Sequence, residues 1–154
     1  MGALVLSAVL GFVNGARTFA PPAIVACAAW LGGLDLAGGW LAWLGTPWAV
    51  ASLTLLTVAE KVADKYPDVP HRVTASALAA RAVAAAVAGG AIAAPAGLLV
   101  AGAVAGAVAA IIGTRVTYGL RALAAKRLGR DLHAALIEDA VVLAVAIGAV
   151  LIAV

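Results

Sequence analysis

The sequence predicts an all-α fold of the membrane class: a polytopic bundle of about five transmembrane helices. The first observation is composition, because 66% of the 154 residues are hydrophobic and only 11% are charged. Soluble domains are about 45–50% apolar and about 25% charged. The second observation is that apolar segments long enough to cross a bilayer recur along the chain. Together these exclude a soluble globular enzyme and a disordered chain, and the single cysteine, Cys27, excludes a disulfide scaffold.

The apolar segments are separated by turns and loops. They are expected at residues 2–31, 48–66, 74–91, 96–128 and 132–154. The first lacks the basic start of a secretory signal peptide, so it is expected to remain as a helix. Residues 82–114 carry no charge and are too long for one span, so residues 89–90 and 95–97 are expected to form a turn within them. No polar stretch is long enough to fold alone, which predicts a single integral membrane domain over residues 1–154.

The first apolar segment contains residues that interrupt a helix. Asn14-Gly15 and Pro21-Pro22 flank Arg17, and proline removes a backbone donor and clashes with the preceding turn. Backbone groups freed inside a membrane must be satisfied by protein or by water. The first helix is therefore predicted to be kinked or broken near mid-membrane. Two interpretations stay open: a simple proline kink, or a functional broken helix of the kind found in transporters.

Basic residues predict the orientation of the bundle. They gather in and beside the second-to-third and fourth-to-fifth connections, as Lys65, Arg72, Arg121, Lys126, Arg127 and Arg130. The other two loops contain no Lys or Arg, so the positive-inside rule places the N-terminus in the cytoplasm and the C-terminus outside. Four tryptophans mark the expected outer interface: Trp30, Trp40, Trp43 and Trp48. The basic stretch 119–130 either fixes the topology or contacts anionic lipid.

Two stretches of the chain are similar to each other. Residues 8–19 and 107–118 share Ala-Val, Gly-x-Arg and Thr-aromatic elements when small gaps are allowed. With five spans they would cross the membrane in opposite directions, which predicts an inverted repeat. Chance similarity in an alanine-rich sequence is the alternative. Gly102, Gly106 and Ala110 form a small-xxx-small face, which indicates either close internal packing or a dimer seam.

Seven ionisable residues are expected at membrane depth, in the cytoplasmic half: Arg17, Glu60, Asp64, Arg81, Arg115, Glu138 and Asp139. Such groups are costly in lipid and usually face the bundle interior or a water-filled cavity. Glu60 and Asp64 share one helix face, whereas Lys61 is expected to extend to the interface. Either the charges form an ion-pair network that only fixes helix packing, or they line a polar cavity. In that cavity, arginines would bind an anionic group and a carboxylate would gate the path or carry protons.

No cofactor and no metal site is predicted. His71 and His133 lie near the inner carboxylates, whose oxygens would suit Mg²⁺ or Mn²⁺, but the sequence shows no tight ligand motif. P-loop, GxSxG, CxxC and dinucleotide-binding motifs are also absent from the sequence. An enzyme acting on a lipid headgroup would need a nucleophile or a metal, so an enzymatic function is not predicted.

Several of these residues form a pattern that resembles a family of small bacterial integral membrane proteins classed only as a domain of unknown function. The pattern joins Gly15-x-Arg17 and Pro21-Pro22 with Glu60-x-x-Ala63-Asp64-Lys65-x-Pro67-x-Val69-x-His71, and with Thr74, Arg81, Gly113-Thr114-Arg115 and Glu138-Asp139. It covers nearly the whole chain. Pro70 stands where the family usually has an acid, and Ala82 where it tends to have proline. The resemblance implies a bacterial inner membrane protein and supports the topology and the choice of residues, but it implies no activity.

The sequence thus predicts a small multi-pass transporter or channel for a small charged solute, with an arginine and carboxylate site in the cytoplasmic half of the membrane. The alternative is a non-transporting membrane protein, a lipid-binding protein or an assembly partner, whose ion network is structural. Membrane lipids are the expected partners, and nucleic acid is not expected. A homo-oligomer is also expected, because five short helices enclose little volume.

Overall fold

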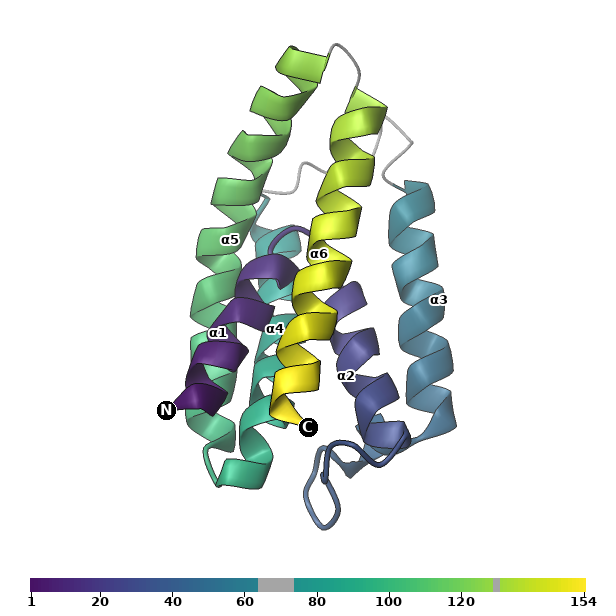
Figure 1. Cartoon of the computed structure of the whole chain (residues 1–154), viewed down its shortest axis with the longest axis vertical. Helices are drawn as coiled ribbons and strands as arrows, with labels where there is room; N and C mark the ends of the chain where they lie inside the picture. Colours follow the sequence, from purple (N-terminus) through teal and green to yellow (C-terminus); the bar gives the residue numbers. More distant parts are fainter. Residues whose placement is uncertain (64–73, 129–130) are drawn as a thin grey trace.

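The structure, a computed structural model, describes residues 1–63, 74–128 and 131–154 of the chain. These parts are helical and contain no strand (Figure 1). The helices are α1 (Gly2–Asn14), α2 (Ala20–Trp30), α3 (Pro47–Ala63), α4 (Ala75–Ala93), α5 (Leu99–Leu128) and α6 (Asp131–Ala153). Two short 3₁₀ helices, η1 (Ala42–Gly45) and η2 (Ala94–Ala96), lie in the connections. The all-α prediction is confirmed.

Three of the described helical segments are long and apolar enough to cross a membrane. They are Ala75–Ala96, Leu99–Ala124 and Ala135–Ala153. The outer faces of α5 and α6 carry many exposed aliphatic side chains, Val100 and Ile152 among them. So much exposed apolar surface suits lipid and not water. The structure therefore supports the membrane character that the composition predicts.

The first apolar segment does not cross the bundle once, because it forms a helical hairpin. α1 runs from the lower end of Figure 1 to the middle of the bundle, and α2 returns from there to the lower end. The N-terminus and the C-terminus consequently lie at the same end, and Gly33, beyond α2, lies against Val154. The first helix, predicted to be kinked or broken, is therefore broken into two helices.

The positions of the prolines explain the break. Pro21 and Pro22 lie in the first turn of α2, where a missing N–H costs little because it has no partner within the helix. The prolines therefore start a new helix instead of kinking an existing one. α1 has already ended at Asn14, and with 13 and 11 residues both helices are too short to span a bilayer.

α1 lies alongside the first half of α5, and the two helices run in the same direction (Figure 1). Gly11 packs against Gly106, and Gly15 packs against Gly113, so the contact advances along both helices together. An inverted repeat of the stretches 8–19 and 107–118 requires opposite directions. The structure therefore gives that repeat no support.

Small residues let α1, α4 and α5 approach one another closely. A side chain on Gly106 would meet the backbone of Ala85 in α4, and Gly11 of α1 approaches the backbone of Gly106. Gly102 approaches Gly89 in the same way, so backbone lies against backbone at both levels. The small-xxx-small face of α5 therefore serves packing within the chain.

The turn between α4 and α5 lies at the predicted residues 95–97 and not at the glycine pair 89–90. Gly89 and Gly90 continue α4, because their missing side chains allow the close contact with α5. The chain turns instead through η2 and Gly97. The φ of Gly97 is 71°, in the left-handed region that glycine adopts without steric cost.

Replacing Gly106 with alanine is expected to lower the thermal unfolding midpoint of the protein in detergent. A Cβ there would collide with the carbonyl oxygen of Ala85, and moving two packed helices apart costs about 2 kcal/mol. Gly119 on the same helix is the matched control, since a Cβ there meets nothing within 4 Å. Gly119→Ala should raise stability by up to about 1 kcal/mol through helix propensity. Equal midpoints in circular dichroism would contradict the close packing.

Candidate functional site

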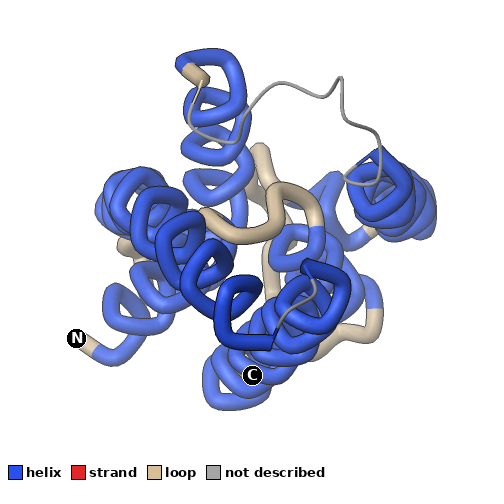
Figure 2. The backbone as a smooth tube through the Cα atoms, turned by 90° about the horizontal axis from the view of Figure 1, so that it is seen from above, coloured by secondary structure: helices blue, strands red, loops and turns tan. Residues whose placement is uncertain are grey.

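We call residues 15–19, which connect α1 and α2, the hairpin tip. Arg17 is only 3% exposed, and its neighbours Ala16 and Thr18 are also buried. In the view along the long axis, the helices surround a central loop (Figure 2). Gly15 packs against Gly113 of α5, about midway along that helix. The tip thus places polar backbone groups inside the bundle, where only the protein or trapped water can satisfy them.

Glu60 of α3 binds the start of α2. Its Oε1 accepts hydrogen bonds from the N–H and the hydroxyl of Thr18, both at 2.9 Å, and its Oε2 accepts one from the N–H of Phe19 at 3.3 Å. Thr18 and Phe19 immediately precede α2, whose N-terminus is the positive end of the helix dipole. The Glu60 carboxylate therefore caps a helix N-terminus, where N–H groups have no partner within the helix.

Arg81 of α4 joins Glu60 to the end of α1. Its Nη2 lies 3.8 Å from Oε1 of Glu60, and its Nη1 donates a hydrogen bond to the carbonyl oxygen of Gly15. Asn14 donates from Nδ2 to the backbone carbonyl of Arg81 at 3.1 Å. Arg81 is buried, so protein groups and not water must compensate its charge. One side chain thus binds both a carbonyl at the helix break and the carboxylate at the start of the next helix.

Asp139 of α6 binds two cations from other parts of the chain. Its Oδ1 lies 2.6 Å from Nε of Arg17, and its Oδ2 lies 3.1 Å from Nζ of Lys61 on α3. The Arg17 side chain is 4% exposed, whereas Lys61 is 40% exposed. A short charge-assisted contact of this kind offsets part of the desolvation that burial costs. Asp139 therefore ties the hairpin tip to α3 and α6.

We call this set of five ionisable residues the tip cluster. Its members are Arg17, Glu60, Lys61, Arg81 and Asp139. All of them except Lys61 are predicted site residues, which the structure brings together from the hairpin tip, α3, α4 and α6. Lys61 was expected only to extend to the interface, but it binds Asp139. Its position next to Glu60 is the one feature of the sequence that could have indicated this role. Thr18 was also missed, although it directly follows Arg17 in the helix break.

Other predicted residues lie apart from the tip cluster or outside the described residues. Arg115 is on the exposed face of α5, where its Nη1 lies 3.5 Å from the carbonyl oxygen of Ile111. Asp64 and His71 lie outside the described residues, and His133 is exposed. In the described part of the chain, no three His, Cys, Asp or Glu residues come together in a way that could hold a metal ion.

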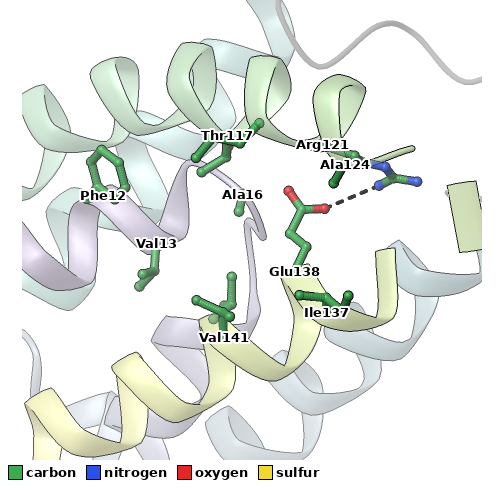
Figure 3. A pocket seen from close by; sticks show the side chains of 11 residues that line it. Phe12, Val13, Ala16, Thr117, Arg121, Ala124, Ile137, Glu138 and Val141 are labelled. Carbon is green, nitrogen blue, oxygen red and sulfur yellow. Dashed lines mark hydrogen bonds and ion pairs between the residues drawn. The ribbon is translucent and has the colours of Figure 1, made fainter. Parts of the chain in front are cut away.

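Glu138 faces a separate pocket between α1, α5 and α6 (Figure 3). Its Oε2 lies 3.3 Å from Nη1 of Arg121 on α5. Adjacent helix positions point about 100° apart, so Glu138 turns toward α5 while Asp139 turns toward the hairpin tip. The pocket has a volume of about 240 Å³, and most of the residues that line it are apolar.

Residues 4–154 match the model of a protein family described as Domain of unknown function (DUF4126). The chain belongs to this family. The match covers the hairpin, the tip cluster and the pocket, and it confirms the resemblance seen in the sequence. No match was found among curated proteins or among solved structures. The description of the DUF4126 family names no activity, so the chemistry of the residues must carry any functional proposal.

Proposed function

We propose that this DUF4126 protein is a small multi-pass membrane transporter or channel for a small anion, with its polar site at the tip cluster. The observation that carries the proposal is the binding of Glu60 at the N-terminus of α2. The N–H groups of Thr18 and Phe19, the Thr18 hydroxyl and the Arg81 guanidinium converge on one carboxylate. The same donors would suit a free anion of similar size when Glu60 leaves.

The use of a charged residue at this position supports a functional role. A neutral amide could also accept hydrogen bonds from the N–H groups of Thr18 and Phe19. Ionisable residues at membrane depth are costly and commonly belong to ion or proton paths, and broken helices in transporters direct half-helix N-termini at anionic groups. When the Glu60 carboxylate moves off these donors, an anion can take its place. Glu60 would then gate the path.

A second function is favoured by a different observation. The protein itself already supplies partners to several polar groups of the hairpin tip, because Glu60 binds Thr18 and Phe19 while Arg81 binds Gly15. In this alternative the tip cluster only holds the hairpin in place. The protein would then be a non-transporting membrane protein that binds lipid or a second copy of itself, and it would carry no solute.

We also propose an orientation that differs from the one expected for five spans. Basic residues in the last turns of α3 and α5 gather at the upper end of Figure 1, as Lys61, Lys126 and Arg127. The loops at the lower end, residues 31–46 and 94–98, contain no Lys or Arg. The positive-inside rule then places the upper end in the cytoplasm of a bacterial inner membrane. Both termini would lie outside.

Cysteine labelling of intact cells is expected to reach the lower end of the bundle and not the upper end. In a Cys27→Ser background, Asp35→Cys places a thiol in the loop 31–46 and Arg127→Cys places one in the last turn of α5; both positions are exposed. A membrane-impermeant maleimide should label the variant at residue 35 directly. The variant at residue 127 should be labelled only after the cells are permeabilised. The reverse pattern would contradict the proposed orientation.

Currents recorded from proteoliposomes on a solid-supported membrane test the proposed transport. Gradients of chloride, nitrate, acetate, phosphate, sodium and potassium are applied at neutral and acidic pH. We expect an anion-dependent current that falls about tenfold or more in Arg81→Gln, because the charged donor to the anion is lost. Arg115→Gln removes an exposed arginine outside the tip cluster and should leave the current unchanged. If folded and inserted protein gives no current with any of these ions, the transport proposal is overturned and the structural alternative is favoured.

A further inference from the structure

A pocket separate from the tip cluster lies where α1 ends. α1 contributes Phe12 and Val13, and the hairpin tip contributes Ala16, while the other walls come from α5 and α6 (Figure 3). α1 stops at Asn14, so α5 and α6 continue past it beside a space of about 240 Å³. A cavity of roughly 150 Å³ with apolar walls already binds a molecule as large as benzene. The pocket can therefore hold a segment of a hydrocarbon chain.

The pocket opens on the outer surface of the bundle. Leu120 of α5, together with Ile137 and Val141 of α6, lines the pocket, and each of these residues is more than half exposed. Val13 and Val142 form buried parts of the wall. The medium outside a membrane-spanning bundle is lipid, and an empty apolar pocket would forfeit dispersion contacts. Hydrocarbon is thus the natural filling of this space.

Cationic groups lie at one end of the pocket. Arg121 and Glu138 line it as an ion pair whose side chains are largely buried. Arg127 follows in the last turn of α5, three residues beyond the pocket residue Ala124 and on the same face of the helix, and it is exposed. Apolar walls with cations at one end match an amphiphile with a hydrocarbon chain and an anionic head. Basic pockets between transmembrane helices bind anionic lipid headgroups in this manner.

We propose that this pocket binds one acyl chain of an anionic phospholipid, whose phosphate contacts Arg127. The acyl chain covers the apolar walls that lie beyond the end of α1, and the lipid headgroup lies beside the last turn of α5. The pair of Arg121 and Glu138 stays intact at the boundary between the two parts. A zwitterionic phospholipid carries a compensating positive charge, so it gains less from the basic residues. The site does not depend on anion transport.

Native mass spectrometry of the detergent-solubilised protein tests the site, with phosphatidylglycerol and phosphatidylcholine of matched chains as probes. We expect the wild-type protein to retain phosphatidylglycerol about tenfold more than phosphatidylcholine. Ala124→Phe fills the pocket and should lower phosphatidylglycerol retention by about tenfold. Arg127→Gln should abolish the preference between the two lipids. Ala122→Phe, on the exposed face of the same helix, is the matched control and should retain the lipid normally.

Val141→Phe fills the same pocket from α6 at an exposed position, so it decides the question where Ala124→Phe fails to fold. Equal retention of the two lipids by the wild-type protein would overturn the proposal. So would undiminished retention in the folded pocket-filling variants. Displacement of the lipid by inorganic phosphate alone would show that the pocket holds no acyl chain, and this would also overturn the proposal. A dimer that Val141→Phe dissociates, without any change in bound lipid, would assign the pocket to a second copy and also overturn the proposal.

Discussion

Replacing Glu60 with glutamine is expected to make anion flux about tenfold faster at neutral pH. In the wild-type protein the carboxylate occupies the donors of Thr18, Phe19 and Arg81. Glutamine has nearly the same shape but carries no charge, so it binds those donors more weakly. A solute anion can then compete for them, and the variant should carry more current than the wild-type protein.

The glutamine variant is also expected to fold. Its amide oxygen can still accept a hydrogen bond from the N–H of Thr18, so the start of α2 keeps a partner. Only the strength of the interaction changes, because hydrogen bonds to charged groups contribute about 1.5–3 kcal/mol and neutral ones about 0.5–1.5 kcal/mol. A loss of about 1.4 kcal/mol changes occupancy tenfold, which sets the size of the expected effect on flux.

Asp35→Asn is the matched control for the loss of a carboxylate. Asp35 is exposed in the loop 31–46, where its Oδ1 accepts a hydrogen bond from the N–H of Ala37 at 2.9 Å. Proteoliposome currents are recorded for both variants at neutral pH. A current in Glu60→Gln no larger than that of the wild-type protein would contradict the competition between Glu60 and the solute anion. Absence of current in the folded variant would contradict the idea that Glu60 occupies the anion site.

Composition predicts the helical class and the extents of α4, α5 and α6, but it does not predict the hairpin. The apolar stretch 2–31 is compatible with one kinked span and also with two short helices that double back. Hydropathy is the same in both cases, because it does not report the direction of the chain. The decisive feature is local: Pro21 and Pro22 begin a helix, so the chain is free to reverse at the hairpin tip.

The cost of burying charge explains why part of the site could be predicted. Arg17, Glu60 and Asp139 stand out because ionisable residues within apolar segments must find polar surroundings. Their partners could not be predicted, since helix periodicity gives the face of a residue but not the helix that it meets. Arg115 shows the same limit. It follows the buried Thr114 by one position, and that rotation of about 100° turns it to the exposed face of α5.

Asp139→Asn is expected to cause the largest loss of stability among single substitutions in the tip cluster. It removes the carboxylate that lies 2.6 Å from Arg17 and 3.1 Å from Lys61. Removing one partner of a buried ion pair costs about 3–5 kcal/mol, because the other charge stays out of water. Arg17→Gln should cost less, since Asp139 keeps its contact with Lys61. Unfolding in detergent by denaturant measures both, and Asp35→Asn should match the wild-type protein.

Combining Arg17→Gln with Asp139→Asn separates a structural role from a functional one. The double variant buries neither of the two charges, so it should be more stable than Asp139→Asn alone. A double variant no more stable than that single variant would contradict the coupling. A folded double variant that still carries anion current would assign the pair to holding the hairpin tip, leaving the anion to Glu60 and Arg81. A folded double variant without current would place Arg17 and Asp139 in the transport site itself, because stability would have been restored without function.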